Sequence, residues 1–209
     1  LYEQDGVLYL TLSTLTGVQE GRPTAEPIGF VLAGDRLVSV RYANPKPVAA
    51  FIAHAVHEQA LVRDGLTALI GLIDAIVDRL ADELENAGAE MENISQGIFA
   101  KEIDERRIPA AQLTAMLTRV GRAQSLVARI RETTVSTIRL LSFLNGSAPL
   151  HRPEGKGHRN HLGSLQTDCS ALLDHASYLG DNLTFLLDAA LGLISVEQNA
   201  AMKLFSWAA

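Results

Sequence analysis

The sequence predicts an α+β protein: a small N-terminal α/β sheet domain, a long antiparallel helical hairpin and a long stalk helix. Strand-forming runs are confined to the region before Pro45, and turn residues separate them. Beyond about Arg63, apolar residues recur every three or four positions almost to the last residue, which is typical of amphipathic helices. With 209 residues, 47% of them hydrophobic and 20% charged, the chain can bury a sizeable core.

Residues 1–60 are expected to form the sheet domain, which opens almost directly in a strand pattern and is therefore predicted to lack its N-terminal part. Gly34-Asp35 predicts a hairpin between two strands, and the polar segment Gly17–Pro27 is expected to be a linker. A short Ala-rich helix is expected over Val48–Ala60. The three strand-forming runs are Val7–Leu12, Ile28–Leu32 and Leu37–Tyr42.

Residues 61–145 are expected to form the helical hairpin. One apolar stripe covers Leu66–Ile98 and a second covers Leu113–Leu144, both with the alternating steps of a coiled-coil seam. The short break at Arg107–Pro109 predicts that the two helices run antiparallel, and Asn145-Gly146 is expected to end the second.

The two helices of the hairpin carry opposite charge, since acids dominate the first and arginines the second. The simplest interpretation is a pair of exposed faces that lie side by side, each ion pair contributing about 0.2–1 kcal/mol. The alternative is a cation-binding surface, because Asp74, Asp78 and Asp82 stack at four-residue spacing. Like charges at that spacing repel, and a bound divalent ion would relieve the repulsion.

Residues 146–160 are expected to be a loop and residues 161–209 a stalk helix. Asp174, Asp181 and Asp188 are seven residues apart, and Ser195, Asn199 and Met202 follow them. At 100° per residue these side chains form one seam along the helix. A solvated face is one interpretation; the other is that several copies surround an axis, so that each carboxylate becomes a ring attracting hydrated divalent cations.

Several other functions are disfavoured. The formal net charge of −6 does not favour sequence-independent binding to nucleic acid. His151, His158 and His161 have no cysteine or carboxylate at metal-ligand spacing, so a zinc site is not predicted. Cys169 lies on an apolar stripe and is expected to be a core residue. No nucleophile–base pair is found, and an enzyme is not predicted.

The run Phe185–Ser206 resembles the end of the stalk helix in CorA-type magnesium transporters, where that helix enters the membrane as the first transmembrane helix. Leu72–Ile98, with its Asp74-Ala75-Ile76-Val77-Asp78 segment, resembles the family's first long acidic helix. Leu113–Leu144 resembles the return helix, and Pro27–Pro47 the hairpin that leads out of the N-terminal sheet.

The resemblance implies a soluble cytoplasmic domain of an inner (plasma) membrane protein, truncated at the start of its first transmembrane helix. It implies homopentamers whose stalk helices line a pore, with Asn199 and Met202 facing the pore and Asp188 forming a carboxylate ring below them. The family's Gly-Met-Asn element would lie beyond the chain, with the helices that contact the membrane. Asp168 is the nearest candidate for the family's inter-subunit regulatory metal site, and the sequence offers no partner for it.

The resulting hypothesis is a Mg²⁺ transporter or channel gated by intracellular divalent ions, in which ions bound between subunits hold the stalks closed. Asp168, Asp174, Asp181 and Asp188 are the candidate metal ligands. Two alternatives remain open at this point: a cytosolic coiled-coil module that binds a basic partner, and a member of the same family that carries Zn²⁺ or Co²⁺.

Overall fold

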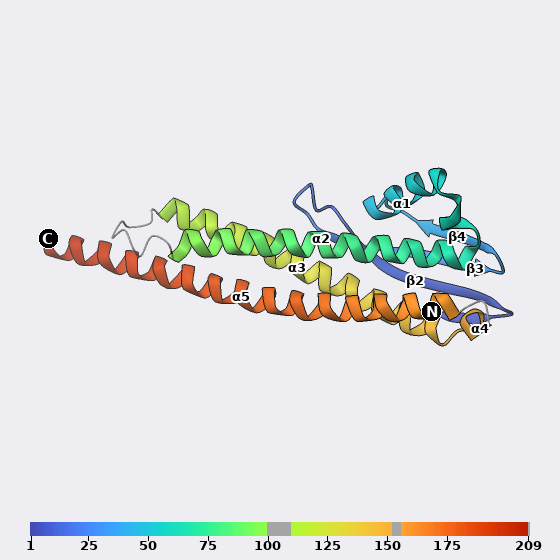
Figure 1. Ribbon diagram of the computed structural model, residues 1–209. Helices are drawn as coiled ribbons and strands as arrows, with labels where there is room; N and C mark the ends of the chain where they lie inside the picture. The colour runs from blue at the N-terminus through green and yellow to red at the C-terminus, as the bar shows by residue number, and fades with distance from the viewer. Residues whose placement is uncertain (100–109, 152–155, 209) are drawn as a thin grey trace. The chain divides into compact units, whose positions relative to one another are not determined.

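The computed structural model describes residues 1–99, 110–151 and 156–208. The elements follow one another as four strands, a helix, a 3₁₀ turn and four further helices, coloured from blue to red along the chain in Figure 1. Two compact units form. The first unit contains Leu1–Leu84 and Arg129–Ala176, and the second contains Glu85–Ala128 and Ser177–Ala209. The α+β class is confirmed, while the division of the chain at residues 60, 145 and 160 stays a prediction.

The sheet lies in the first unit and is antiparallel, with strand order β1-β2-β3-β4. Leu8, Leu10 and Leu12 of β2 are buried, whereas the alternate Thr11 is exposed. The same alternation in β3 buries Ile28, Phe30 and Leu32, so that one face of the sheet belongs to the core. The strands are β1 Tyr2–Gln4, β2 Val7–Thr16, β3 Thr24–Ala33 and β4 Arg36–Arg41.

Both long strands extend beyond the predicted runs, and Pro27 lies inside β3 although proline is rare in sheet interiors. The pairing explains why. Pro27 is opposite Ser13 of β2, but β4 pairs with β3 only from Ile28 onward. Residues 24–27 therefore have one unpaired edge, where a missing N–H breaks no ladder hydrogen bond.

Helix α1 spans Lys46–His57, the 3₁₀ turn η1 spans Gln59–Val62, and α2 spans Gly65–Phe99. Asp64 precedes α2 and accepts hydrogen bonds from the Thr67 backbone N–H at 2.7 Å and the Thr67 hydroxyl at 2.8 Å. Burial raises the pKa of Asp64, but these bonds and the neighbouring Arg63 outweigh it and leave the pKa below its ordinary value. An ionised carboxylate therefore begins α2, as favoured by the positive end of a helix.

Helix α3 spans Ala110–Asn145, α4 spans Ala148–His151, and α5 spans Lys156–Ala208. The short α4 and the first residues of α5 occupy part of the predicted loop 146–160, and α5 begins before the expected His161. The predicted break at Arg107–Pro109 lies outside the described residues. In the second unit, Glu90 of α2 bonds Arg119 of α3, and Gly97 lies beside Met116. From the first contact to the second, the residue number rises in α2 and falls in α3, so the two helices run antiparallel there.

Candidate ion-binding and pore-lining residues

Four carboxylates gather on α2 and α5 within the first unit. Asp74, Asp78 and Asp82 follow one another along α2, and Asp168 belongs to α5. Burial is the largest cause that raises the pKa of Asp78, and repulsion from Asp74, Asp82 and Asp168 raises it further. We call these four residues the acidic cluster. The structure thus supplies a neighbour for Asp168, which the sequence could not.

His161 of α5 adds a titratable group beside the acidic cluster. Its Nε2 lies 3.5 Å from Oδ1 of Asp74, with the two side chains 46% and 42% exposed. The contact becomes an ion pair only when the imidazole is protonated. This pair was not predicted from the sequence, because the two residues are on different helices and no local spacing links them.

The acidic cluster presents the hard oxygen ligands that Mg²⁺ prefers. Within the described ranges of a single chain, however, no group of three or more His, Cys, Asp and Glu side chains has the arrangement of a metal site. The cluster is therefore an electronegative surface rather than a closed coordination shell. Mg²⁺ usually keeps several waters when it binds protein, so an open surface of this kind suits a hydrated ion.

The predicted seam of α5 is exposed. Asp174, Asp181 and Asp188 are exposed, as is Asn199, and Met202 is 61% exposed. Asp168, the other candidate metal ligand on α5, is exposed as well. The Ser195 hydroxyl donates to the Leu191 carbonyl oxygen at 3.0 Å, so it bonds to its own helix. Apolar residues fill the other flank, since Leu179, Leu183, Leu186 and Ala190 are buried in the second unit. The amphipathic helix is confirmed, and the roles of the seam in lining a pore and binding metal stay predictions.

The predicted pairing of acidic and basic helices is confirmed at one place in the second unit. Arg119 donates from Nε to Oε1 of Glu90 at 2.7 Å and from Nη2 to Oε2 at 2.9 Å. The guanidinium holds the pKa of Glu90 below its usual range, and Glu90 raises the pKa of Arg119. This pair accounts for its charges without a bound ion.

Cys169 is fully buried, as predicted for a core residue. Burial, with a smaller contribution from the neighbouring Asp168, raises the pKa of its thiol to about 11. A thiol with so high a pKa is a poor metal ligand or nucleophile at neutral pH. Of the three histidines considered for a zinc site, His151 has a side chain that lies outside the described residues.

A family model described as "CorA-like Mg2+ transporter protein" matches residues 1–209. The chain belongs to this family. The magnesium transport protein CorA of Escherichia coli (strain K12) is 26% identical over 179 residues, covering 86% of this chain and 54% of that protein. CorA of Yersinia pseudotuberculosis (serotype I, strain IP32953) is 25% identical over the same length. The chain therefore spans about half the length of the curated relatives it matches.

Solved structures show the same fold. The complete CorA magnesium transporter from Methanocaldococcus jannaschii superposes with a TM-score of 0.77 at 15% identity, covering 98% of this chain and 61% of that one. The soluble domain of the same CorA gives 0.73 at 14% identity, covering 92% and 72%. The full-length CmaX protein also gives 0.73 at 14% identity, covering 99% and 60%. At these identities the likeness establishes the fold alone.

Among the described residues of this CorA family member, one helix is long and apolar enough to span a membrane. This helix is the stretch Gly157–Val196 of α5, which meets the requirement by length and composition alone.

Proposed function

We propose that this chain is the cytosolic part of a homopentameric Mg²⁺ transporter of the plasma membrane, whose pore is controlled by intracellular divalent ions. The observation that carries the proposal is the match of the whole chain to the CorA-like Mg²⁺ transporter family. It favours a transporter over a coiled-coil interaction module and over an enzyme. Co²⁺ and Zn²⁺ remain alternative cargoes, because hydrated oxygen sites distinguish such ions by geometry.

The exposed seam of α5 supports the pore-lining role. Asp188, Asn199 and Met202 are exposed in the single chain, so they are available to face other copies. Around a common axis, Asp174, Asp181 and Asp188 would form successive carboxylate rings, and Asn199 would follow with a ring of amides. Such rings concentrate hydrated divalent cations.

The acidic cluster supports the regulatory role. Asp78 is already repelled by Asp74, Asp82 and Asp168, so an ion that binds these carboxylates, alone or with a neighbouring copy, stabilises the arrangement that holds them together. Loss of the ion restores the repulsion and shifts the population toward a looser, conducting arrangement.

Thermal unfolding of the purified chain with millimolar Mg²⁺ and with chelator tests the regulatory part. We expect Mg²⁺ to raise the midpoint for the wild type and to raise it less for Asp78→Asn and Asp168→Asn. Glu85→Gln is the matched control, since Glu85 is exposed on the same helix. If Mg²⁺ raised the midpoint equally in all four proteins, the acidic cluster would not be the regulatory ion-binding site. Co²⁺ and Zn²⁺ serve as further arms.

Cysteine cross-linking in membranes of cells that express the gene tests the pore-lining part. In a Cys169→Ala background, Asp188→Cys and Asn199→Cys are each expected to form disulfide-linked dimers between neighbouring copies. Arg122→Cys, exposed on α3, is the control and should not. Uptake of Mg²⁺ by the same cells reports transport. Linkage through Arg122→Cys but not through the α5 positions would contradict the pore-lining assignment.

A further inference from the structure

A small pocket in the first unit lies apart from the seam and the acidic cluster. It is formed by the end of β2, the turn that joins β2 to β3, the start of α1 and two residues of α2. Its volume is about 150 Å³, which is room for about five water molecules at roughly 30 Å³ each. Leu15, Val18, Pro45 and Pro47 give it apolar walls. A compact ligand fits this space.

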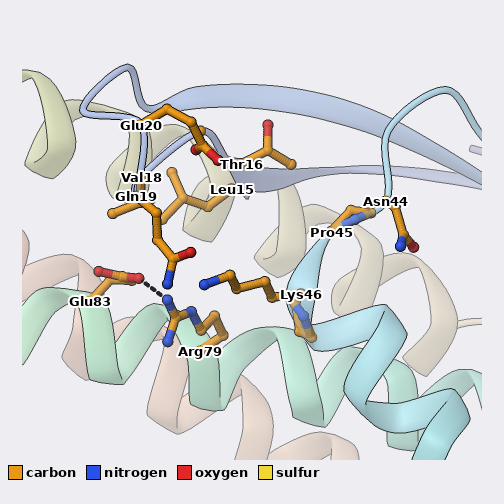
Figure 2. Close-up of a pocket in the computed structure, with 12 residues that line it drawn as sticks. Leu15, Thr16, Val18, Gln19, Glu20, Asn44, Pro45, Lys46, Arg79 and Glu83 are labelled. Carbon is orange, nitrogen blue, oxygen red and sulfur yellow. Dashed lines mark hydrogen bonds and ion pairs between the residues drawn. The ribbon is translucent and has the colours of Figure 1, made fainter.

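Nitrogen donors converge in the pocket. Figure 2 shows the amine of Lys46 and the amide of Gln19 both directed toward the guanidinium of Arg79. The three groups come from α1, the β2–β3 turn and α2, so they approach a common point from different directions. An anion with several acceptor oxygens satisfies such a set.

The charges of the lining favour an anion beside Lys46. Glu83 forms an ion pair with Arg79 from the neighbouring turn of α2, and its side chain is only 6% exposed. This pair is neutral overall. Within the described residues no ion pair involves Lys46. Glu20, the remaining charged residue of the lining, lies beside Thr16 on the opposite side of the pocket in Figure 2.

The backbone around the pocket is fixed in place. The β2–β3 turn is closed by hydrogen bonds from the Arg22 N–H to the Gly17 carbonyl oxygen at 2.9 Å and from the Gly21 N–H to the Val18 carbonyl oxygen at 3.1 Å. Gly17 has φ +70°, and a Cβ there would collide with the Arg22 carbonyl oxygen. Gln19 is therefore held by a turn of defined shape. At the other wall, α1 begins at Lys46 without a side-chain cap, so its positive end adds to the field.

We propose that this pocket binds a compact tetrahedral oxyanion of the phosphate class. Lys46 supplies the uncompensated charge, Arg79 supplies N–H donors besides the one that Glu83 accepts, and Gln19 supplies a neutral donor. A planar carboxylate offers only two oxygens to donors that come from three directions, so phosphate uses the set more fully. The site is independent of the divalent-ion function proposed above.

Calorimetric titration of the purified chain with inorganic phosphate, in chelator and at constant ionic strength, tests the proposal. We expect saturable binding of one phosphate. Lys46→Met keeps the apolar stem and should weaken binding at least about tenfold, the usual order for losing a charged hydrogen-bond partner. Lys46→Arg should restore most of the affinity, and Glu20→Gln should increase it about twofold to threefold by removing the remaining carboxylate at the rim.

Arg122→Met is the matched control, because it removes one exposed positive charge from α3, outside the pocket. Its phosphate affinity should equal that of the wild type. The proposal is overturned by an absence of saturable binding, by equal losses in Lys46→Met and Arg122→Met, or by acetate binding as tightly as phosphate. Because chelator is present throughout, these outcomes do not depend on whether Mg²⁺ binds elsewhere.

Discussion

Arg119 of α3 donates two parallel hydrogen bonds to the carboxylate of Glu90 on α2, at 2.7 and 2.9 Å. This geometry orients both side chains and links the two antiparallel helices across the second unit. The side chains are 40% and 39% exposed, so water screens much of the attraction. The pair therefore specifies how the helices align more than it stabilises them.

Arg119→Met combined with Glu90→Gln in a double-mutant cycle is expected to give a coupling free energy of about 0.5–1 kcal/mol, the upper part of the range for exposed pairs. Since Glu90 has a lowered pKa in the folded chain, its contribution is present above its ordinary pKa of 4.5 and is lost as the pH falls through the folded value. Urea unfolding at pH 7 and pH 3 measures both effects. A coupling that stays the same at pH 3 would contradict the ionic origin.

Asp78→Asn is expected to stabilise the chain at pH 7 in the absence of divalent ions. The folded pKa of Asp78 is raised from 3.8, so the favourable neutral form is fully present below that value and is lost as the pH rises through the folded pKa. Asparagine stays neutral, and relief of like-charge repulsion is worth about 0.2–0.5 kcal/mol per helical pair. Asp78 has two such neighbours, Asp74 and Asp82, and it is exposed, so we expect a gain of at most about 1 kcal/mol in urea unfolding.

The gain from Asp78→Asn should vanish at pH 3, where the aspartate is itself protonated. Glu85→Gln, which removes one negative charge from α2 outside the acidic cluster, controls for net charge and should have a smaller effect at pH 7. Destabilisation by Asp78→Asn alone would show that the carboxylate has a favourable partner.

The long helices were predictable because each one repeats its own signal. Buried Leu69, Ile73, Ile76 and Leu80 of α2 recur at helical spacing, and a period sustained over many turns outweighs any single residue. Strand β1 was not predicted, because Tyr2–Gln4 has only three residues and all of them are exposed. The ends of β2 and β3 were missed because pairing, rather than propensity, orders the polar residues near Pro27.

The candidate site was predictable only within one helix at a time. The spacing of Asp74, Asp78 and Asp82 places them on one face of α2, and the sequence contains that fact. The approach of Asp168 to Asp78 depends on how α2 and α5 are rotated relative to each other. The apolar repeat within each helix does not determine that rotation. The pocket of Lys46 and Arg79 was missed for the same reason, because three separate segments meet there.

Gly71→Ala is expected to destabilise the chain by about 1–3 kcal/mol, although alanine favours helices more than glycine does. A Cβ at position 71 would lie 2.6 Å from the ring of Phe51, which is itself buried. Overpacking of this kind forces neighbouring side chains to move and outweighs the roughly 1 kcal/mol gained from helix propensity. Thermal or urea unfolding measures the difference.

Gly163→Ala is the matched control, because a Cβ there on α5 meets nothing within 4 Å. It should stabilise by up to about 1 kcal/mol. The double variant Gly71→Ala with Phe51→Leu should recover part of the loss by shortening the ring that collides. Equal effects of the two glycine substitutions would mean that the α1–α2 contact does not constrain position 71.

Cys169 is expected to react with thiol reagents at pH 7 far more slowly in the folded chain than in the unfolded chain. Burial raises its pKa from 9.0 to about 11, which lowers the thiolate fraction roughly a hundredfold, since one pKa unit is a factor of ten; burial also blocks access to the sulfur. The raised pKa stabilises the folded chain fully below pH 9.0, and this contribution is lost as the pH rises through about 11. The Cys169→Ala variant lacks the titrating group, so the unfolding free energy of this variant should fall less between these pH values than that of the wild type. Asp168→Asn should leave the thiol slow, because burial is the larger cause of the shift; fast labelling of this variant would assign the protection to the neighbouring charge instead.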